Sequence, residues 1–144
     1  MKEMIRDVPD FPKKGIIFKD ITPLLGDPVA FHKTINTLKD RYADKQLDAV
    51  VGVEARGFIF ASALAYALSI GVVMIRKPGK LPYKTFQETY SLEYGTDTVE
   101  VHQDAFRGGQ NILVIDDVLA TGGTLSATLE LIQKNFKNVT VVEA

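Results

Sequence analysis

The residues best suited to chemistry lie between positions 112 and 124, where an apolar run leads into two adjacent carboxylates and a glycine turn. Asp116 and Asp117 follow four consecutive apolar residues, and a Thr-Gly-Gly-Thr sequence occupies positions 121–124. The first N–H groups of a helix have no partner within the helix and attract phosphate, and glycines let the backbone approach closely. Carboxylates repel phosphate, so these two suit sugar hydroxyls or a hydrated magnesium ion. The segment therefore predicts a site for a phosphorylated sugar.

The elements around this segment support that interpretation. Apolar residues recur at helical spacing after the glycines, at Leu125, Leu129, Ile132 and Phe136, so a helix begins where the glycine turn stops. The turn contains no lysine and its glycines lack the GxGxxG spacing, which excludes the triphosphate P-loop and the dinucleotide motif. Either fragment alone would be an ordinary strand-to-helix connection, but their order between a strand and a helix favours phosphate binding.

Two further strand ends carry residues that bind anions. Arg56 follows a buried strand at 49–53, and three cations within residues 76–80 follow a second strand at 72–75. Each of these loops alone would be an ordinary solvated loop. Ligands of parallel sheets bind outside the carboxyl ends of the strands, so we expect the three strand ends to meet in one site. Together they favour contact with a polyphosphate.

Strands that alternate with helices indicate an α/β fold, with a mostly parallel sheet and helices on both faces. Asp27 and Pro28 predict the start of a helix that continues to about residue 43. A second helix is expected from residue 58 to about residue 68. Alternating patterns around 90–94 and 98–102 predict an antiparallel strand pair.

Composition indicates an ordinary globular chain and excludes several classes of protein. Hydrophobic residues make up 46% of the 144 residues and charged residues 24%, so one domain spanning 1–144 is expected. A net charge of −1 argues against a nucleic-acid partner bound by bulk electrostatics. The absence of cysteine excludes disulfides and thiolate metal sites. The N-terminus lacks the apolar stretch of a signal peptide, so a cytoplasmic protein is expected.

One uncharged stretch, 58–75, reaches the length of about 18 residues that a membrane-spanning helix needs. Ser62, Ser69 and Gly71 interrupt it, and residues 72–75 have the β-branched character of a strand. A buried helix followed by a buried parallel strand explains this stretch better, so no membrane span is expected.

The order of these segments resembles a known family. The carboxylate pair with its glycine turn is similar to the phosphoribosyl-pyrophosphate signature of the type I phosphoribosyltransferases. Four further blocks resemble the adenine phosphoribosyltransferase branch of that family: Phe11-Pro12-x-x-Gly15-x-x-Phe18-x-Asp20-Ile21-Thr22-Pro23, Glu54-x-Arg56-Gly57-Phe58, Arg76-Lys77-x-Gly79-Lys80-Leu81-Pro82 and Tyr90-Ser91-Leu92-Glu93-Tyr94-Gly95. The resemblance implies the type I phosphoribosyltransferase fold, with an N-terminal hood segment at 1–26 that recognises the base. It also implies a flexible catalytic loop and antiparallel hairpin at 76–96.

The implied activity is purine salvage. Ribose 5-phosphate would pass from phosphoribosyl pyrophosphate to N9 of adenine, giving AMP and pyrophosphate. The resemblance implies Mg²⁺ carried by the substrate, with no metal site made of protein ligands. The reaction creates an oxocarbenium-like centre and an anionic leaving group, and cations with magnesium would stabilise that leaving group. Members of this family are typically homodimers, so the expected partners are adenine, phosphoribosyl pyrophosphate and a second copy of the chain.

The resemblance also implies which residues bind each part of the two substrates. The 5-phosphate would lie on Ala120, Thr121, Gly122, Gly123 and Thr124, and the ribose hydroxyls on Asp116 and Asp117. The pyrophosphate would lie on Glu54, Ala55, Arg56, Lys77 and Lys80. The adenine would lie near Ile16, Ile17, Phe18 and Lys19. A cis peptide bond in the pyrophosphate turn is expected at Ala55–Arg56.

Two residues are assigned to catalysis by the resemblance, Arg56 and Glu93. Arg56 would stabilise the leaving pyrophosphate, and Glu93 would protonate or hydrogen-bond N7 as the purine accepts the sugar. Tyr94 would belong to the loop that closes over the site and excludes water. The plain alternative for Glu93 is an exposed strand glutamate. The plain alternative for the loop aromatics is a subunit interface formed by Tyr83, Phe86 and Tyr90.

Two departures from the family and two rival functions stay open. Lys19 stands where many members carry arginine. Residues 141–144 end inside an expected strand, whereas family chains continue for another strand and a C-terminal element, so a truncated chain is expected.

An oxopurine transferase of the xanthine type is the first rival, because the choice between 6-amino and 6-oxo purines depends on backbone contacts. A non-catalytic domain that senses phosphoribosyl pyrophosphate is the second, although the chain has no helix-turn-helix to spare.

Overall fold

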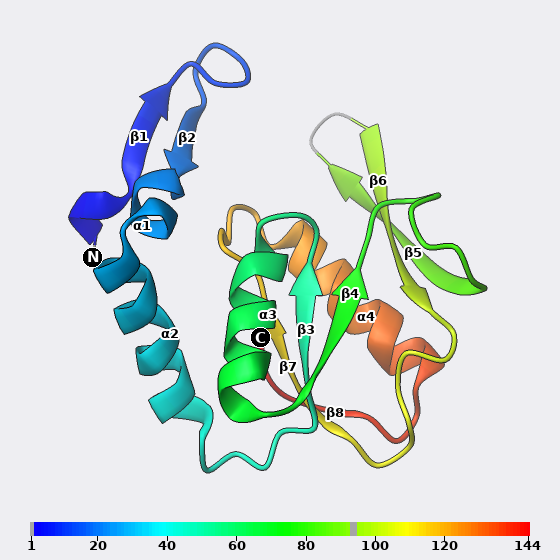
Figure 1. Cartoon of the computed structure of the whole chain (residues 1–144). Helices are drawn as coiled ribbons and strands as arrows, with labels where there is room; N and C mark the ends of the chain where they lie inside the picture. The colour runs from blue at the N-terminus through cyan, green and yellow to red at the C-terminus, as the bar shows by residue number, and fades with distance from the viewer. Residues whose placement is uncertain (1, 93–94) are drawn as a thin grey trace. The chain divides into compact units, whose positions relative to one another are not determined.

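The computed structural model describes residues 2–92 and 95–144, and Figure 1 shows their helices and strands. The chain divides into two compact units, Met1–Arg41 and Tyr42–Ala144. Two residues that the sequence assigns to the site, Glu93 and Tyr94, lie outside the described residues.

The first unit combines a small hairpin with helices. A 3-10 turn, η1 (Lys2–Met4), precedes the antiparallel strands β1 (Arg6–Pro9) and β2 (Ile17–Asp20), and the short helix α1 (Thr22–Gly26) follows. Helix α2 (Pro28–Tyr42) begins where the sequence predicts, because Asp27 Oδ1 accepts a hydrogen bond from Ala30 N at 2.8 Å. Its last turn carries Lys39 and Arg41, whose charges favour the negative end of the helix dipole.

The second unit contains a four-stranded parallel sheet in the order β4-β3-β7-β8. Its strands are β3 (Ala49–Val53), β4 (Gly71–Ile75), β7 (Asn111–Ile115) and β8 (Thr140–Glu143). Helices α3 (Gly57–Leu68) and α4 (Gly123–Asn135) cover opposite faces of this sheet (Figure 1). The predicted parallel sheet with flanking helices is confirmed.

Strand β3 is buried along its whole length, which explains its continuous apolar sequence. On one side, Val51 belongs to a core cluster that also contains Leu131 and Ile132 of α4. On the other side, α3 lies so close that a Cβ at Gly52 would stand 2.8 Å from Cβ of Ala61. The glycine therefore lets the first turns of α3 pack directly on the sheet.

The uncharged stretch 58–75 lies mainly in helix α3 and strand β4, as the sequence predicts. The helix ends at Leu68 because Ser69 adopts the left-handed conformation (φ 59°) and its N–H donates to the Tyr66 carbonyl at 3.1 Å. No helix within residues 2–92 and 95–144 is long and apolar enough to cross a membrane.

An antiparallel hairpin of β5 (Thr85–Leu92) and β6 (Gly95–His102) forms a separate two-stranded sheet. It confirms the predicted strand pair, and both strands are longer than the sequence predicts. Val99 of β6 belongs to the same core cluster as α4, and Phe86 packs edge-to-face on Phe136 with ring centroids 5.6 Å apart. A bridge between Arg76 and Glu100 joins the hairpin to the end of β4. The hairpin is therefore held against both α4 and β4.

Candidate functional site

The Thr-Gly-Gly-Thr turn follows the end of β7, and its last two residues begin α4. Gly122 caps the helix with a positive φ of 81°, a conformation that residues other than glycine rarely adopt. The helical bonds start with Ser126 N donating to Gly122 O at 2.9 Å, so the N–H groups of the intervening residues have no helical partner. Thr121 Oγ1 accepts a long bond of 3.4 Å from Gly123 N. The five residues predicted to bind the 5-phosphate, 120–124, thus share one loop at a helix N-terminus.

The two carboxylates that follow β7 differ in environment. Asp117 is nearly buried, with 6% of its side chain exposed, and its Oδ2 lies 2.9 Å from Nε of Arg56. That oxygen accepts no hydrogen bond, so its contact with Arg56 is an ion pair without hydrogen-bond geometry. Asp116 Oδ1 accepts a hydrogen bond from Asp117 N at 2.9 Å. Burial raises the pKa of Asp116 to about 6, and the adjacent Asp117 charge adds to the rise.

Close packing brings Arg56 beside these carboxylates. A Cβ at Gly57 would stand 2.8 Å from the Ile115 carbonyl oxygen and 3.1 Å from Asp116 Oδ1. Glycine at this position therefore lets the start of α3 approach the end of β7. Arg56 is the N-cap residue of α3, so the ends of β3 and β7 meet as the sequence predicts.

The cis peptide bond of this turn lies between Glu54 and Ala55, so the prediction of a cis bond at Ala55–Arg56 is wrong by one residue. The Ala55–Arg56 bond lies at the start of α3. Ala55 O accepts a hydrogen bond from Phe58 N at 3.3 Å, and Arg56 has helical angles (φ −76°, ψ −25°). A helical turn is built from trans peptide bonds, which agrees with a trans bond at Ala55–Arg56.

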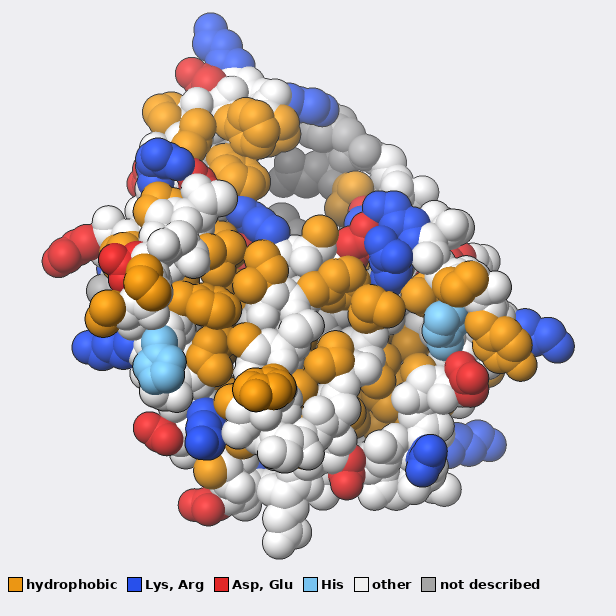
Figure 2. All heavy atoms as spheres, in the orientation of Figure 1, with side chains coloured by type: hydrophobic (Ala, Val, Ile, Leu, Met, Phe, Trp, Pro, Cys, Tyr) orange, Lys and Arg blue, Asp and Glu red, His pale blue; other side chains and the backbone are white. Residues whose placement is uncertain are grey.

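Glu54 organises the basic loop at the end of β4. Its side chain is 9% exposed; Oε2 accepts hydrogen bonds from Lys77 N (2.8 Å) and Arg76 Nε (3.2 Å), and Oε1 accepts from Lys80 Nζ. Burial opposes the ionisation of Glu54, but the hydrogen bonds from Lys80, Lys77 and Arg76 lower its pKa. Basic and acidic side chains accordingly lie in contact at the upper right of Figure 2. A carboxylate repels an anion, so this geometry supports a role for Glu54 in holding the cations of the loop.

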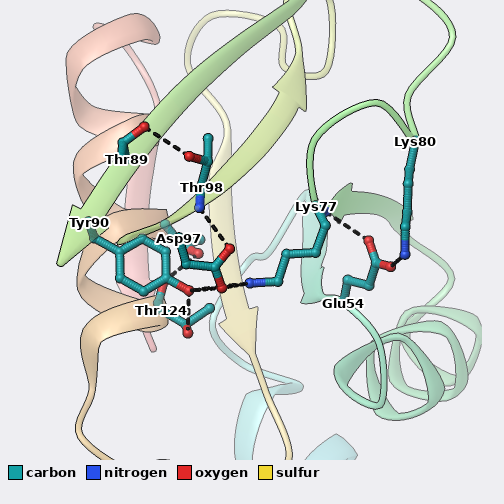
Figure 3. A network of polar contacts seen from close by, with 9 residues as sticks. Glu54, Lys77, Lys80, Thr89, Tyr90, Asp97, Thr98 and Thr124 are labelled. Atoms are coloured by element: carbon teal, nitrogen blue, oxygen red, sulfur yellow. Dashed lines mark hydrogen bonds and ion pairs between the residues drawn. The ribbon is translucent and has the colours of Figure 1, made fainter. Parts of the chain in front are cut away.

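The ammonium group of Lys77 contacts the hairpin (Figure 3). Lys77 Nζ donates to Asp97 Oδ2 and, at 3.4 Å, to the Tyr90 hydroxyl. That hydroxyl donates to Asp97 Oδ2 at 3.1 Å and lies 2.9 Å from Thr124 Oγ1. Burial opposes the charge of Lys77, but the contacts with Asp97 and Tyr90 raise its pKa. The sequence analysis gives Asp97 no role and names Tyr90 only in a family block and as a loop aromatic, because the strand register alone places the two residues opposite each other.

Every cation named at these strand ends has a carboxylate partner. Arg56 pairs with Asp117, Lys77 with Asp97, and both Arg76 and Lys80 with Glu54. The protein itself therefore fixes the positions of these cations. Within residues 2–92 and 95–144, no group of three or more His, Asp or Glu side chains could hold a metal ion. The arrangement suits a ligand that carries several negative charges beside free hydroxyls.

The residues assigned to adenine lie in the first unit, on β2 and in the turn before it. Ile16 and Ile17 are exposed, and Phe18 packs edge-to-face on Phe11 with ring centroids 5.2 Å apart. Lys19 Nζ forms an ion pair of 2.5 Å with a carboxylate of β1. The first unit therefore displays exposed apolar side chains near an aromatic pair, a surface suited to the faces of a flat base.

Comparison with known proteins identifies a family whose sequences match this chain. The family model described as Phosphoribosyl transferase domain matches residues 30–140. The adenine phosphoribosyltransferase of Syntrophotalea carbinolica is 58% identical over 134 residues, which cover 93% of this chain and 78% of the relative. The likeness therefore extends over nearly the whole of this chain.

Solved structures agree with the fold. A crystal structure of adenine phosphoribosyltransferase from Thermoanaerobacter pseudethanolicus gives a TM-score of 0.91 at 49% identity, covering 97% of this chain and 80% of that one. The Saccharomyces cerevisiae protein is complexed with D-2,5-dideoxy-2,5-imino-altritol 1,6-bisphosphate and adenine. It gives a TM-score of 0.89 at 36% identity, covering 99% of this chain and 86% of that one.

Proposed function

Because the chain belongs to the adenine phosphoribosyltransferase family, we propose that it converts adenine and 5-phosphoribosyl 1-pyrophosphate to AMP and pyrophosphate. One observation carries the proposal, the position of the glycine turn of α4 beside the cluster of Asp116, Asp117 and Arg56. A phosphate site therefore adjoins carboxylates and a cation, which is the combination that a phosphorylated ribose with a charged leaving group requires.

The donor binds through both its phosphate and its sugar. The 5-phosphate lies on the loop of residues 120–124, where backbone N–H groups and the dipole of α4 attract it. Asp116 and Asp117 accept hydrogen bonds from the ribose hydroxyls. Protonation of Asp116 below about pH 6 removes one of these acceptors, so donor binding strengthens as the pH rises through that value.

Transfer breaks the bond between C1 of the ribose and the pyrophosphate oxygen, a new bond joins C1 to N9 of adenine, and the ring N–H proton that adenine loses passes to solvent. Positive charge develops on the ribose and negative charge on the leaving pyrophosphate. Arg56, Lys77 and Lys80 stabilise the negative charge, because their carboxylate partners hold them in fixed positions. The second group assigned to catalysis, Glu93, hydrogen-bonds or protonates N7 while N9 accepts the sugar.

The residues present fit a magnesium ion that arrives with the donor. Mg²⁺ keeps several waters and binds through one or two carboxylates together with substrate phosphates, and Asp116 and Asp117 offer that set. Residues 2–92 and 95–144 contain no group of three or more His, Asp or Glu side chains that could hold a metal ion. When bound, the ion supplies charge neutralisation to the leaving pyrophosphate.

The acceptor base is assigned to residues 1–26, in which Ile16, Ile17, Phe18 and Lys19 contact adenine. The exposed apolar side chains of Ile16 and Ile17 support this assignment. Residues 1–144 then act as one phosphoribosyltransferase domain, and 76–96, which includes Tyr94, serve as the loop that closes over the substrates and excludes water. A homodimer and a cytoplasmic location stay predictions.

Product analysis with a panel of bases tests the proposal. The chain is incubated with Mg²⁺, phosphoribosyl pyrophosphate and one purine base at a time, and nucleoside monophosphates are separated by chromatography. AMP from adenine is expected, with no monophosphate from hypoxanthine, guanine or xanthine. A monophosphate from xanthine instead of adenine would indicate an oxopurine transferase. Donor binding without product from any base would indicate a sensing domain.

A further inference from the structure

One side chain, Tyr90 of β5, contacts residues from both phosphate-binding ends of the proposed donor site (Figure 3). Its hydroxyl lies 2.9 Å from Thr124 Oγ1 in the glycine turn, and Lys77 Nζ donates to the same hydroxyl at 3.4 Å. The ammonium also lies 5.8 Å from the centroid of the Tyr90 ring, within the range of a cation–π contact. Tyr90 therefore joins a cation assigned to pyrophosphate to the loop assigned to the 5-phosphate.

The hydrogen bonds around the Tyr90 oxygen have a defined direction. A phenol donates one proton and accepts through its lone pairs. The Asp97 carboxylate, 3.1 Å away, can only accept, so it takes the tyrosine proton. Lys77 can only donate, and with the tyrosine proton already committed, Thr124 must also donate to the Tyr90 oxygen. One oxygen atom thus orients the ammonium of Lys77 and holds the side chain of Thr124, which leaves the backbone N–H of Thr124, rather than its hydroxyl proton, for a phosphate.

Lys77 keeps a donor for a ligand. An ammonium has three N–H bonds, and two of them are directed to Asp97 and Tyr90. The side chain remains 34% exposed, so the third N–H is within reach of an anion from solvent. A lysine stem has considerable rotamer freedom, and the two protein contacts remove that freedom before a ligand binds.

The aromatic ring of Tyr90 lies against the glycine turn. A Cβ at Gly123 would stand 3.4 Å from Cδ2 of the ring. The strand register holds the ring there, because Tyr90 lies opposite Asp97 in the pairing of β5 with β6. A change that removes only the hydroxyl therefore keeps this packing, frees the Thr124 hydroxyl and removes one of the two contacts that hold Lys77, while the contact with Asp97 stays.

We propose that Tyr90 is a positioning residue for the phosphoribosyl donor, acting on the pyrophosphate end through Lys77 and on the 5-phosphate end through Thr124. The inference rests on the proposed function and extends it, because Tyr90 works through other residues rather than on the substrate. Asp97 completes the arrangement by accepting the tyrosine proton and by holding Lys77. Loss of the Tyr90 hydroxyl weakens both ends of the donor and leaves adenine binding unchanged.

The test measures two fragments of the donor separately. Calorimetric titration in the presence of Mg²⁺ gives the dissociation constants of ribose 5-phosphate and of pyrophosphate. The proteins compared are the wild-type chain, Tyr90→Phe, Lys77→Met and the double variant. Tyr90→Phe is expected to weaken each ligand about three- to tenfold, the range for one lost hydrogen bond. In the Lys77→Met background, Tyr90→Phe is expected to weaken ribose 5-phosphate as before and to leave pyrophosphate unaffected.

Thr98→Val is the matched control. It removes a cross-strand hydrogen bond from the same hairpin, between Thr89 Oγ1 and Thr98 Oγ1 at 2.9 Å, and that bond involves neither Lys77 nor Thr124. Both dissociation constants and the KM for adenine are expected to stay at their wild-type values in this variant. Equal losses in Thr98→Val and Tyr90→Phe would contradict the inference, because hairpin stability would then explain both.

Three other outcomes are decisive. An additive effect on pyrophosphate in the double variant would rule out action through Lys77. Wild-type affinity of Tyr90→Phe for ribose 5-phosphate would rule out action through Thr124, while AMP formation by the wild-type chain would keep the proposed function intact. A wild-type chain that binds neither fragment would overturn the inference and the proposed function together.

Discussion

The 5-phosphate loop (residues 120–124) and the basic loop (residues 76–80) are both proposed to bind phosphate groups, but different parts of the chain build them. The 5-phosphate loop offers backbone N–H groups at the start of α4, with Gly122 at a φ of 81°. The basic loop offers side-chain cations that Glu54 and Asp97 hold in place. The first site depends on backbone conformation, and the second depends on carboxylate partners supplied by other strands.

This difference determines how each loop responds to substitution. The directions of backbone N–H groups follow φ and ψ, so a change of backbone conformation disables the 5-phosphate loop whatever its side chains are. A cation of the basic loop keeps its charge when its partner is removed, but it loses its fixed position. We therefore expect large effects from glycine changes in the first loop and moderate effects from carboxylate changes around the second.

The largest effect is expected from Gly122→Ala. Alanine is disfavoured in the left-handed conformation by roughly 1–2 kcal/mol, and relief of that strain turns the N–H groups of α4 away from the phosphate. We expect kcat/KM for phosphoribosyl pyrophosphate to fall at least about 100-fold in steady-state assays. Gly109→Ala is the control, because Gly109 has a similar φ of 83°, open space around it and no role in the site. Similar losses of activity in both variants would contradict the claim that the 5-phosphate loop depends on the backbone conformation of Gly122.

A moderate effect is expected from Glu54→Gln, which should affect the basic loop and leave the 5-phosphate loop unchanged. Loss of the carboxylate charge releases Arg76 and Lys80, so pyrophosphate should bind about tenfold more weakly. Ribose 5-phosphate should change by less than about twofold, because the hydrogen bonds of Glu54 go to residues of the basic loop. Inhibition by each compound against phosphoribosyl pyrophosphate measures the two affinities. Equal weakening of both inhibitors would show that the loops do not act independently.

The smallest effect is expected in the stability of the fold, from the carboxyl group of Asp116. Its pKa of about 6 exceeds the ordinary value of 3.8, so the folded state binds this proton more tightly than the unfolded state. The free energy of unfolding therefore falls as the pH rises from about 4 to about 6. Asp116→Asn should be more stable at about pH 7.5 by on the order of 1–2 kcal/mol, with no gain at about pH 4. Urea unfolding at the two pH values measures this, and equal gains at both would contradict the pKa assignment.

The 5-phosphate loop could be predicted from the sequence better than the side-chain contacts of the basic loop could. The glycine turn, the carboxylate pair and the helix after them are contiguous, so their spacing alone specifies the loop. Lys77 and Asp97 meet only because β5 and β6 pair in one register and the hairpin lies against β4. No local pattern contains that information.

Two details at the end of β3 show the same limit. The cis peptide bond precedes Ala55 rather than Arg56, and Arg56 already has the helical angles of the start of α3. Glu54 was assigned to pyrophosphate from its place in the motif. Its buried contacts with Arg76 and Lys80 come from a different strand end, so the motif alone does not show that Glu54 also holds these cations.

Phosphorus NMR of a single reaction mixture tests transfer to adenine most directly. With the chain, Mg²⁺, adenine and phosphoribosyl pyrophosphate, we predict that the donor signals disappear while AMP and pyrophosphate signals grow in equal amounts. Without adenine the donor signals should persist, because the proposed closure of 76–96 would keep water from the reacting carbon. Persistence of the donor when adenine is present, or release of pyrophosphate without AMP, would contradict the account.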